Sequence, residues 1–272
     1  MAKTVRELRL ALGFAETKRG DWVVADVDGI QLVKKGTTQL IGALEREELS
    51  CVGVNAEGTL LAAVTYKEVS LFSLPGFKPL WSVKSAIFEA RSLIFTKEGL
   101  WHCARTGAER LDLKSGKQRE KVGQGTRPLA ISADGKWWLA HGSENGKDAV
   151  GPAKTRRAVE VPAQVSAFLP DGTVLTADGT SGKLALALID PASGAVKKSA
   201  VGVAVPGGPV SELNVSRSGK RAAVRVDEGF VTIDVDSLAT KLLKLEQAQL
   251  AAFASDDQTL LLATRKFSHR KA

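Results

Sequence analysis

The side chains that most often carry acid–base or metal chemistry are few in this sequence and widely spaced. The three histidines are His102, His141 and His269, and no two of them have the spacing of metal ligands. Asp26, Asp178 and His141 occupy matching positions of a repeat described below, but three such groups are few for a metal-dependent hydrolase. No G-x-S-x-G segment, P-loop or dinucleotide fingerprint occurs. The sequence therefore predicts a protein that is not an enzyme, with no catalytic residue, no metal site and no cofactor.

Composition is that of a folded, water-soluble chain rather than a disordered one. The 272 residues are 44% hydrophobic and 25% charged. No apolar run approaches the roughly 18 residues of a membrane span, and the start MAKTVRELRL lacks the apolar region of a signal peptide. We therefore expect a cytoplasmic location and no transmembrane segment. Cys51 and Cys103 are too few for a disulfide framework, so small buried thiols are expected.

Six segments of one shape recur along the chain, each with two apolar stretches around a tight polar turn. They are GVNAEGTLLAAV, IFTKEGLWHCAR, AISADGKWWLAH, AFLPDGTVLTAD, NVSRSGKRAAVR and AFASDDQTLLLAT. The turn positions that mark seven units are Gly20, Gly58, Gly99, Gly135, Gly172, Gly219 and Gln258, and Asp257 is an equally good choice for the last. An acidic residue followed by glycine suits a hairpin, because the side chain caps the turn and glycine accepts a positive φ.

A second position repeats five residues after each marker. It holds Ala25, Ala63, Ala104, Ala140, Ala177, Val224 and Ala263. Small side chains at one register of the second strand indicate crowding, as where neighbouring sheets converge.

Units one, two, three, five and six continue with a third strand, such as EVSLFSL or FVTIDVD, and a more polar fourth strand follows, such as KSGKQREKV. Four short strands in about 40 residues is the period of a β-propeller blade. Residues 237–250 are the nearest candidate for a helix, and we interpret them as the fourth strand of unit six followed by a linker. The sequence thus predicts an all-β, seven-bladed propeller of four-stranded antiparallel blades, with residues 1–272 in a single domain.

These motifs resemble the WD40-like and YVTN/TolB-type β-propeller repeats of bacteria, whose signature reads approximately S-P-D-G-K-x-L-A. Matching segments are SADGKWWLA (132–140), LPDGTVLTA (169–177) and SDDQTLLLA (255–263). The segments LDLKSGK (111–117) and IDPASGA (189–195) resemble the I-D-x-x-S/T-G ending of the third strand. The G-H and W-D dipeptides of eukaryotic WD40 repeats are missing. The resemblance implies the fold and leaves the function open, because this architecture carries unrelated activities.

The seventh unit holds only two strands before the basic tail RKFSHRKA. Propellers of this family commonly complete the last blade with an N-terminal strand, and residues 4–10, TVRELRL, alternate well enough to serve. An open ring, or edges covered by a second subunit, is the alternative, because an unpaired strand edge favours association. The sequence leaves the oligomeric state undetermined.

In a propeller, the turns between first and second strands lie on one face. The starts of the first strands and the ends of the second strands meet on the opposite face, at the mouth of the central channel. One residue beyond the repeated small position stand Asp26, Val64, Arg105, His141, Asp178, Arg225 and Thr264, and the first strands begin near Ser50, Arg91, Arg127, Gln164 and Ser211. This polar ring of mixed sign is either a binding site or a set of ordinary solvated strand ends with mutual ion pairs.

Irregular loops and basic clusters are further candidates for recognition. Residues 141–161 stand where a regular hairpin and third strand should be, and residues 202–210 lengthen the unit before Gly219. The net charge is +8, with basic clusters at Lys34 and Lys35, at Lys114, Lys117, Arg119 and Lys121, at Lys154, Arg156 and Arg157, and in the tail. Such clusters attract nucleic acid or anionic surfaces, although scattered ones usually form a solvated surface.

The sequence predicts a non-catalytic β-propeller scaffold that mediates protein–protein interaction through the channel mouth and the irregular loops. The candidate partner-binding residues are Arg91, Arg105, Arg127, His141, Arg156, Arg157, Asp178 and Arg225. One alternative is a propeller enzyme or small-ligand sensor that uses the central channel. Another is an electrostatic binder of nucleic acid or of a membrane surface.

Overall fold

The computed structural model consists of β-strands joined by turns. It describes residues 11–16, 21–26, 29–34, 37–42, 49–55, 57–65, 68–74, 76–84, 90–104, 106–122, 128–140, 148–155, 158–161, 163–206, 208–244, 248–253, 256–257 and 260–264. Of these, residues 11–16, 25–26, 29, 31–34, 37–42, 90–91, 128, 248–250 and 261–264 are described by their backbone alone. Within the described ranges, no helix has the length and hydropathy needed to cross a membrane.

The strands form six four-stranded antiparallel sheets and one two-stranded sheet, each in chain order, which we number as blades one to seven. Blade one is β1 (Ala11–Glu16), β2 (Trp22–Asp26), β3 (Gly29–Lys34) and β4 (Thr37–Gly42), and blade two is β5 (Leu49–Val54), β6 (Leu60–Thr65), β7 (Glu68–Ser73) and β8 (Lys78–Lys84). Blade three is β9 (Ala90–Thr96), β10 (Gly99–Ala104), β11 (Gly107–Leu111) and β12 (Gln118–Val122), and blade four is β13 (Pro128–Ile131), β14 (Trp137–Ala140), β15 (Asp148–Pro152) and β16 (Val159–Val161). Blade five is β17 (Val165–Phe168), β18 (Val174–Asp178), β19 (Lys183–Ile189) and β20 (Val196–Ala204), blade six is β21 (Ser211–Val215), β22 (Arg221–Val226), β23 (Gly229–Asp234) and β24 (Thr240–Lys244), and blade seven is β25 (Ala248–Phe253) and β26 (Leu260–Thr264).

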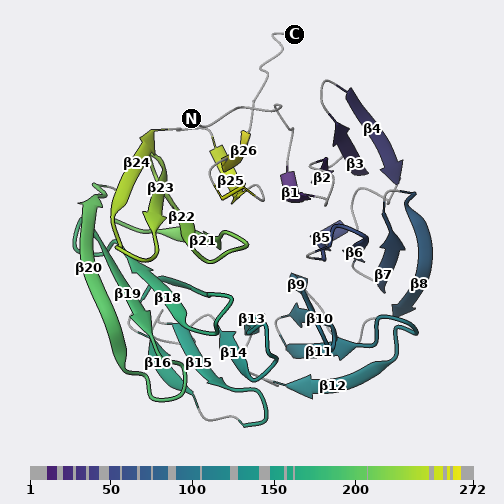
Figure 1. Cartoon of the computed structure of the whole chain (residues 1–272), viewed down its shortest axis with the longest axis horizontal. Coiled ribbons are helices and arrows are strands. Elements are labelled where there is room, and N and C mark those ends of the chain that lie inside the picture. Colours follow the sequence, from purple (N-terminus) through teal and green to yellow (C-terminus); the bar gives the residue numbers. More distant parts are fainter. Residues whose placement is uncertain are drawn as a thin grey trace.

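The seven blades form a closed ring around a central channel (Figure 1). The first strand of each blade contacts the first strand of the next, through β1, β5, β9, β13, β17, β21 and β25, and β25 contacts β1 again. The fourth strands lie toward the rim (Figure 1). The predicted seven-bladed propeller is confirmed, and residues 240–244 form β24 rather than a helix. The predicted closing strand, residues 4–10, lies outside the described residues.

The first turns of blades two, four, five and six have a left-handed glycine at the marker position. The φ angles are 65° at Gly58, 71° at Gly135, 87° at Gly172 and 77° at Gly219. The N–H of Gly58 donates to the carbonyl of Asn55 at 2.9 Å, which closes the turn of blade two. In blade seven, Asp257 has a φ of 54°. Asp257, rather than Gln258, therefore takes the glycine's place in the last unit, in keeping with the tolerance of aspartate for this region.

Apolar side chains pack between neighbouring blades, so both faces of a sheet are buried. Trp101 of blade three and Trp138 of blade four share one such cluster, and each is 1% exposed. Leu186 of blade five and Val231 of blade six belong to another. Because a four-stranded sheet has two apolar faces, only stacking on both neighbours removes them from water.

The five repeated small residues whose side chains the structure describes are buried, but they do not all face the same neighbour. Ala63 packs against blade one, in a cluster with Val23 and Ile30. Ala177 packs instead toward blade six, in a cluster with Val224. The reason is the length of the first turn, which spans six residues in blade two, where Val54 pairs with Leu61, and five in blade five, where Phe168 pairs with Val174. A shift of one residue turns each side chain to the other face of the sheet, so the single register expected from the sequence is wrong for blade five.

The crowding at Ala63 predicts that a larger side chain there destabilises the fold. Ala63 is completely buried, so we expect Ala63→Leu to lower the free energy of unfolding by about 1–3 kcal/mol. Ala192→Leu, at an exposed turn position, is the matched control and should leave stability unchanged. Urea unfolding followed by tryptophan fluorescence measures both. Equal stability of the two variants would contradict tight packing between blades one and two.

Candidate functional site

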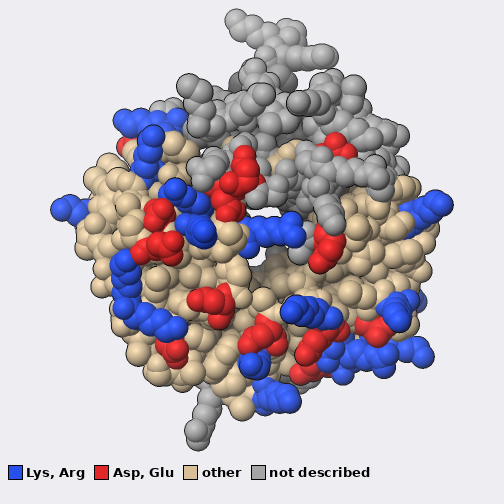
Figure 2. Space-filling view, in the orientation of Figure 1, with Lys and Arg blue, Asp and Glu red and all other residues tan. Residues whose placement is uncertain are grey.

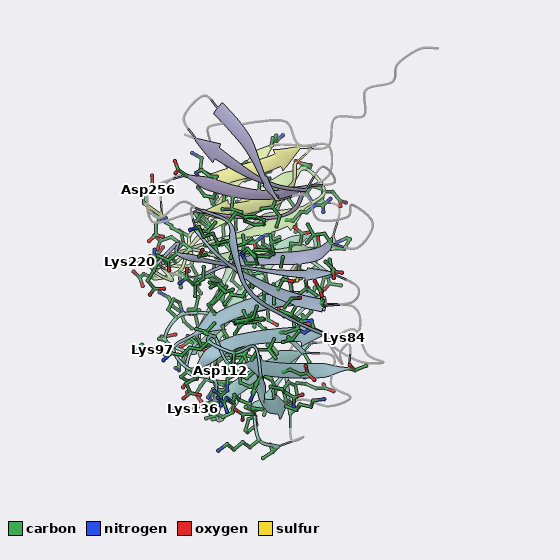
Figure 3. All side chains as sticks on the ribbon, turned by 90° about the vertical axis from the view of Figure 1, so that its right-hand side faces the viewer. Lys84, Lys97, Asp112, Lys136, Lys220 and Asp256 are labelled. Atoms are coloured by element: carbon green, nitrogen blue, oxygen red, sulfur yellow. The ribbon has the colours of Figure 1, made fainter. Side chains whose placement is uncertain are left out.

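The channel mouth is the end of the ring at which first strands begin and second strands end. Ser211, the first residue of β21, pairs with Arg225 near the end of β22. The first turns lie at the opposite end, where Lys97, Lys136 and Lys220 stand together on one side of the molecule, away from Lys84 (Figure 3). The division of the ring into a turn face and a mouth face is therefore as the sequence predicts.

A β-bulge stands at the mouth end of six of the seven first strands. In each, the pairing with the second strand skips one residue next to the start of the strand. The skipped residues are Leu12, Ser50, Arg91, Leu129, Glu212 and Gln249. Bulges redirect a side chain and are enriched at barrel rims and beside active sites. The same bulge is thus repeated around the mouth. In each of these six blades it leaves one residue of the first strand unpaired with the second strand.

Glu212, the bulge residue of β21, combines backbone strain with burial. Its φ is 51°, in the left-handed region that non-glycine residues rarely adopt. Its Oε1 lies 3.7 Å from Nη1 of Arg225, whereas its Oε2 is buried and has no hydrogen-bond partner within the described part of the chain. Burial raises the pKa of Glu212, and the charge of Arg225 opposes that rise. Strain and a perturbed carboxyl together are typical of functional sites.

Two further mouth residues are held by local hydrogen bonds. Asp178 Oδ1 accepts from the N–H of Thr180 at 2.7 Å and also from its hydroxyl. Gln164 Oε1 accepts from the N–H groups of Gly179 at 3.0 Å and Val210 at 3.1 Å, which ties blade five to the segment that leads into blade six. Gln164 therefore has a structural role, and the carboxylate of Asp178 is positioned at the end of β18.

Behind the mouth, an open cavity of about 1030 Å³ lies in the channel between the first strands of blades three to six. Ser211 and Glu212 line it at the mouth, and Pro170 and Arg217 line it at the turn face. Apolar side chains of the first strands, such as Leu213, line the space between. A cavity of this size, mostly apolar with a few polar groups, has the character of a ligand pocket.

The structure describes only part of the predicted site. Asp178 and Arg225 lie at the mouth, and Arg91 is the bulge residue of β9, described by its backbone alone. The other predicted residues, Arg105, Arg127, His141, Arg156 and Arg157, lie outside the described residues. Glu212 was missed by the sequence reasoning. A bulge leaves no signal in the alternation of one short strand, and the shared spacing of the strand starts pointed only to its neighbour Ser211.

The two cysteines, Cys51 and Cys103, are buried. Burial raises the pKa of the Cys51 and Cys103 thiols to about 12, as expected for free, buried cysteines. Over the described ranges, no group of three or more histidine, cysteine, aspartate or glutamate side chains is placed to hold a metal ion.

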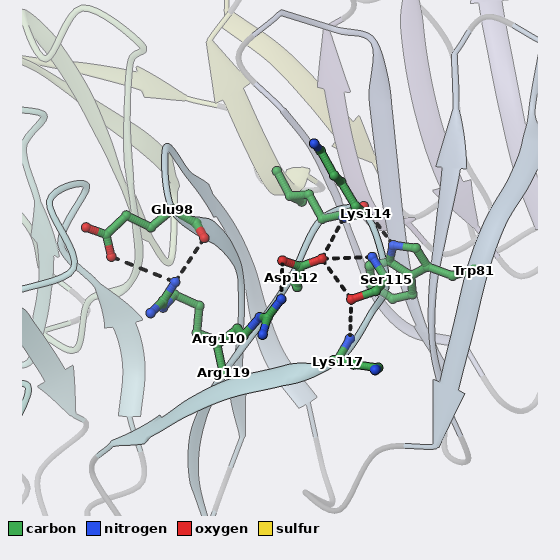
Figure 4. A network of polar contacts seen from close by, with 9 residues as sticks. Trp81, Glu98, Arg110, Asp112, Lys114, Ser115, Lys117 and Arg119 are labelled. Atoms are coloured by element: carbon green, nitrogen blue, oxygen red, sulfur yellow. Dashed lines mark hydrogen bonds and ion pairs between the residues drawn. The ribbon is translucent and has the colours of Figure 1, made fainter.

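The basic cluster of blade three is interleaved with acidic groups (Figure 4). Arg119 pairs with Asp112 at 3.1 Å, and Lys121 pairs with Glu109 at 2.8 Å. Asp112 also accepts hydrogen bonds from the backbone and hydroxyl of Ser115, and these bonds together with Arg119 hold its pKa at about 2. The described part of the turn face carries both signs of charge around the central opening (Figure 2).

Several solved structures share the propeller fold of this chain at low sequence identity. A chain of the mitotic checkpoint complex has a TM-score of 0.73 at 14% identity, over 97% of this chain and 90% of that one. Hsv2 of Kluyveromyces lactis has a TM-score of 0.62 at 11% identity, over 89% and 86%. Hydrazine synthase of Kuenenia stuttgartiensis has a TM-score of 0.59 at 17% identity, over 79% and 73%. At these identities the likeness shows the fold alone.

No protein family and no curated protein matches the sequence.

His102 is fully buried. It shares a face of β10 with Leu100, two residues away, which belongs to the cluster between blades two and three. Burial lowers the pKa of His102 from 6.5 to about 4. Between these two pH values the unfolded chain binds a proton that the folded chain does not. Stability is therefore retained above pH 6.5 and falls as the pH drops toward 4.

We expect wild-type protein to lose about 2–3 kcal/mol more unfolding free energy between pH 7.5 and pH 4.5 than the His102→Ala variant does. Urea unfolding at the two pH values measures this difference, and subtracting the variant's change removes the contribution of the carboxyl groups. Equal losses in both proteins would show that His102 is not the buried titrating group.

Proposed function

We propose that this chain is a non-catalytic propeller that binds another protein at the channel mouth. The observation that carries the proposal is the ring of bulges, which frees one residue per blade at the same end of six first strands. A ring of positions drawn from many blades makes a broad surface, which suits a protein better than a small molecule. The likeness to a chain of the mitotic checkpoint complex is consistent with a propeller that works within an assembly.

The binding residues are those that the sequence places at the mouth, together with Glu212. Arg91, Arg105, Arg127 and Arg225 offer guanidinium groups, His141 a ring nitrogen and Asp178 a carboxylate. Arg156 and Arg157 form a separate part of the proposed surface, because Ala153, shortly before them in the chain, donates its N–H to the carbonyl of Lys136 on the turn face. Arginine is enriched at the centre of protein interfaces because its planar group makes several hydrogen bonds at once. We also infer that the repeats belong with the bacterial YVTN/TolB type.

A second candidate is a small-ligand sensor or enzyme that uses the channel. It is favoured by the cavity of about 1030 Å³ with the strained Glu212 on its wall. Stoichiometric metal in untagged protein, measured by inductively coupled plasma spectrometry, would support an enzyme. The nucleic-acid alternative is less favoured, since Arg119 and Lys121 of the blade-three cluster are paired with acidic side chains.

The role of the mouth is tested by replacing two of its positively charged side chains. We expect Arg105→Gln with Arg225→Gln to reduce recovery of the partner at least tenfold in quantitative pull-downs from the native cell, because both side chains would contact it. The same melting temperature as wild type would show that the fold is intact. Lys97→Gln with Lys220→Gln is the control, because it removes the same charge from the turn face (Figure 3).

The proposal would be contradicted if partner recovery were unchanged in the mouth variant, or if it were equally reduced in the control. The second outcome would indicate a general attraction by net charge, and a steep loss of binding with added salt would then be expected.

A further inference from the structure

Arg217 differs from the other arginines whose side chains the structure describes, because it has no ion pair. Arg110, Arg119, Arg221 and Arg225 each lie 3.7 Å or less from a carboxylate oxygen. Arg217, on the turn between β21 and β22, forms neither an ion pair nor a hydrogen bond with any described residue. A guanidinium group presents several N–H donors in one plane, which match the two oxygens of a carboxylate. Arg217 is therefore available to an anion from outside the chain.

Arg217 lies at one end of the channel cavity of about 1030 Å³, at the turn face. The equivalent turn positions of blades four and five hold Ala133 and Pro170, which line the same cavity and carry no charge. Figure 2 shows positively charged side chains reaching the edge of the central opening on this face. Among the described residues that line this end of the cavity, Arg217 is thus the one charged group.

Between its two ends, the cavity has a mainly apolar wall that is only partly covered. Each of the four residues of β17 is partly exposed, and three of them, Val165, Ala167 and Phe168, are apolar. In β18, the next strand outward, four of the five residues are buried. Leu129 of β13 and Leu213 of β21 line the same space and are also partly exposed. The first strands therefore leave apolar surface in the channel that a ligand can cover.

The mouth end of the cavity carries carboxylates that are already engaged. Asp148, at the start of β15, is fully buried and accepts a hydrogen bond from Ser166. Glu212 lies 3.7 Å from Arg225, so that guanidinium is already paired. Two carboxylates at this end disfavour a third anionic group there. A ligand carboxylate is therefore favoured at Arg217, at the opposite end.

The distance between the two ends limits the size of the ligand. β21 and the turn after it separate Glu212 from Arg217 by about 16 Å of extended chain, at roughly 3.3 Å per residue. A linear apolar chain of about this length spans the cavity. A small molecule fits better than a folded partner, because the space lies inside the ring, between the first strands of four blades.

We infer that the channel binds a small, elongated apolar carboxylic acid, with its carboxylate on Arg217 and its apolar chain along the first strands of blades three to six. Binding combines charge-assisted hydrogen bonds at one end with burial of apolar surface along the rest of the molecule. The site lies behind the mouth, goes beyond the proposed protein interface and does not depend on it.

Isothermal titration calorimetry of the full chain with decanoate, below the concentration at which decanoate forms micelles, tests the site. We expect saturable binding of one decanoate per chain. Decylammonium has the same apolar chain with the opposite charge, and acetate has the carboxylate without the chain. Each should bind at least tenfold more weakly than decanoate, because each lacks one of the two interactions.

Arg217→Gln removes the charge at the turn-face end and should weaken decanoate binding at least tenfold. The melting temperature should not change, because the side chain of Arg217 is exposed and has no ion pair with the described residues. Lys220→Gln is the matched control, since Lys220 is an exposed cation on the same turn and does not line the cavity (Figure 3). This control should bind decanoate as wild type does.

Absence of decanoate binding, equal binding of decylammonium or acetate, or no effect of Arg217→Gln would overturn the inference. An equal loss in Lys220→Gln would also overturn it, because it would indicate a general attraction by net charge.

The mouth variant, Arg105→Gln with Arg225→Gln, should bind decanoate as wild type does. Loss of decanoate binding in that variant would place the carboxylate at the mouth and reject the site at Arg217. Arg217→Gln should in turn recover the protein partner as wild type does in pull-downs. The channel site and the protein interface can therefore fail separately.

Discussion

Burial of both faces of each blade against its two neighbours is the interaction on which this structure depends. A single blade exposes apolar side chains on either side of its sheet, and only a closed circuit of blades covers all of them. The contact of β25 with β1 completes that circuit. Trp101 and Trp138 show its effect, because these residues of neighbouring blades are both buried in one shared cluster. The residues of each blade that pack against neighbouring blades are thereby constrained, whereas many residues at the mouth, in the turns and on the outer strand are not.

That freedom accounts for where the candidate sites lie. At the mouth, the bulges release Glu212 and its counterparts from the ladder without disturbing the packing between blades. At the other end of the channel, Arg217 lies on the turn between β21 and β22, outside the strands that pack against neighbouring blades. Binding surfaces can therefore change in this fold without loss of the core, which explains how one architecture serves unrelated activities.

Much of this could be predicted from sequence because the repeat copies the same local chemistry seven times. The marker glycines and the alternation of the strands specify hairpins, and their period specifies blades. The predicted register of the repeated small residue was wrong for Ala177. There, a one-residue difference in turn length moves the side chain to the other face of the sheet. Glu212 was missed because a bulge depends on how two strands pair.

The amino-acid sequence by itself determined the number of blades, the positions of the turns and the polar character of the mouth, because these follow from local alternation and turn propensity. Only the tertiary structure decided which neighbour each small residue faces, that Asp257 serves as the last turn marker, and that Glu212 is strained and half-buried beside Arg225. It also decided that Val201 is exposed while Ile189, on the same sheet, is buried. The physical reason is that burial and pairing are relations between segments far apart in the chain, and they exist only once the ring has closed.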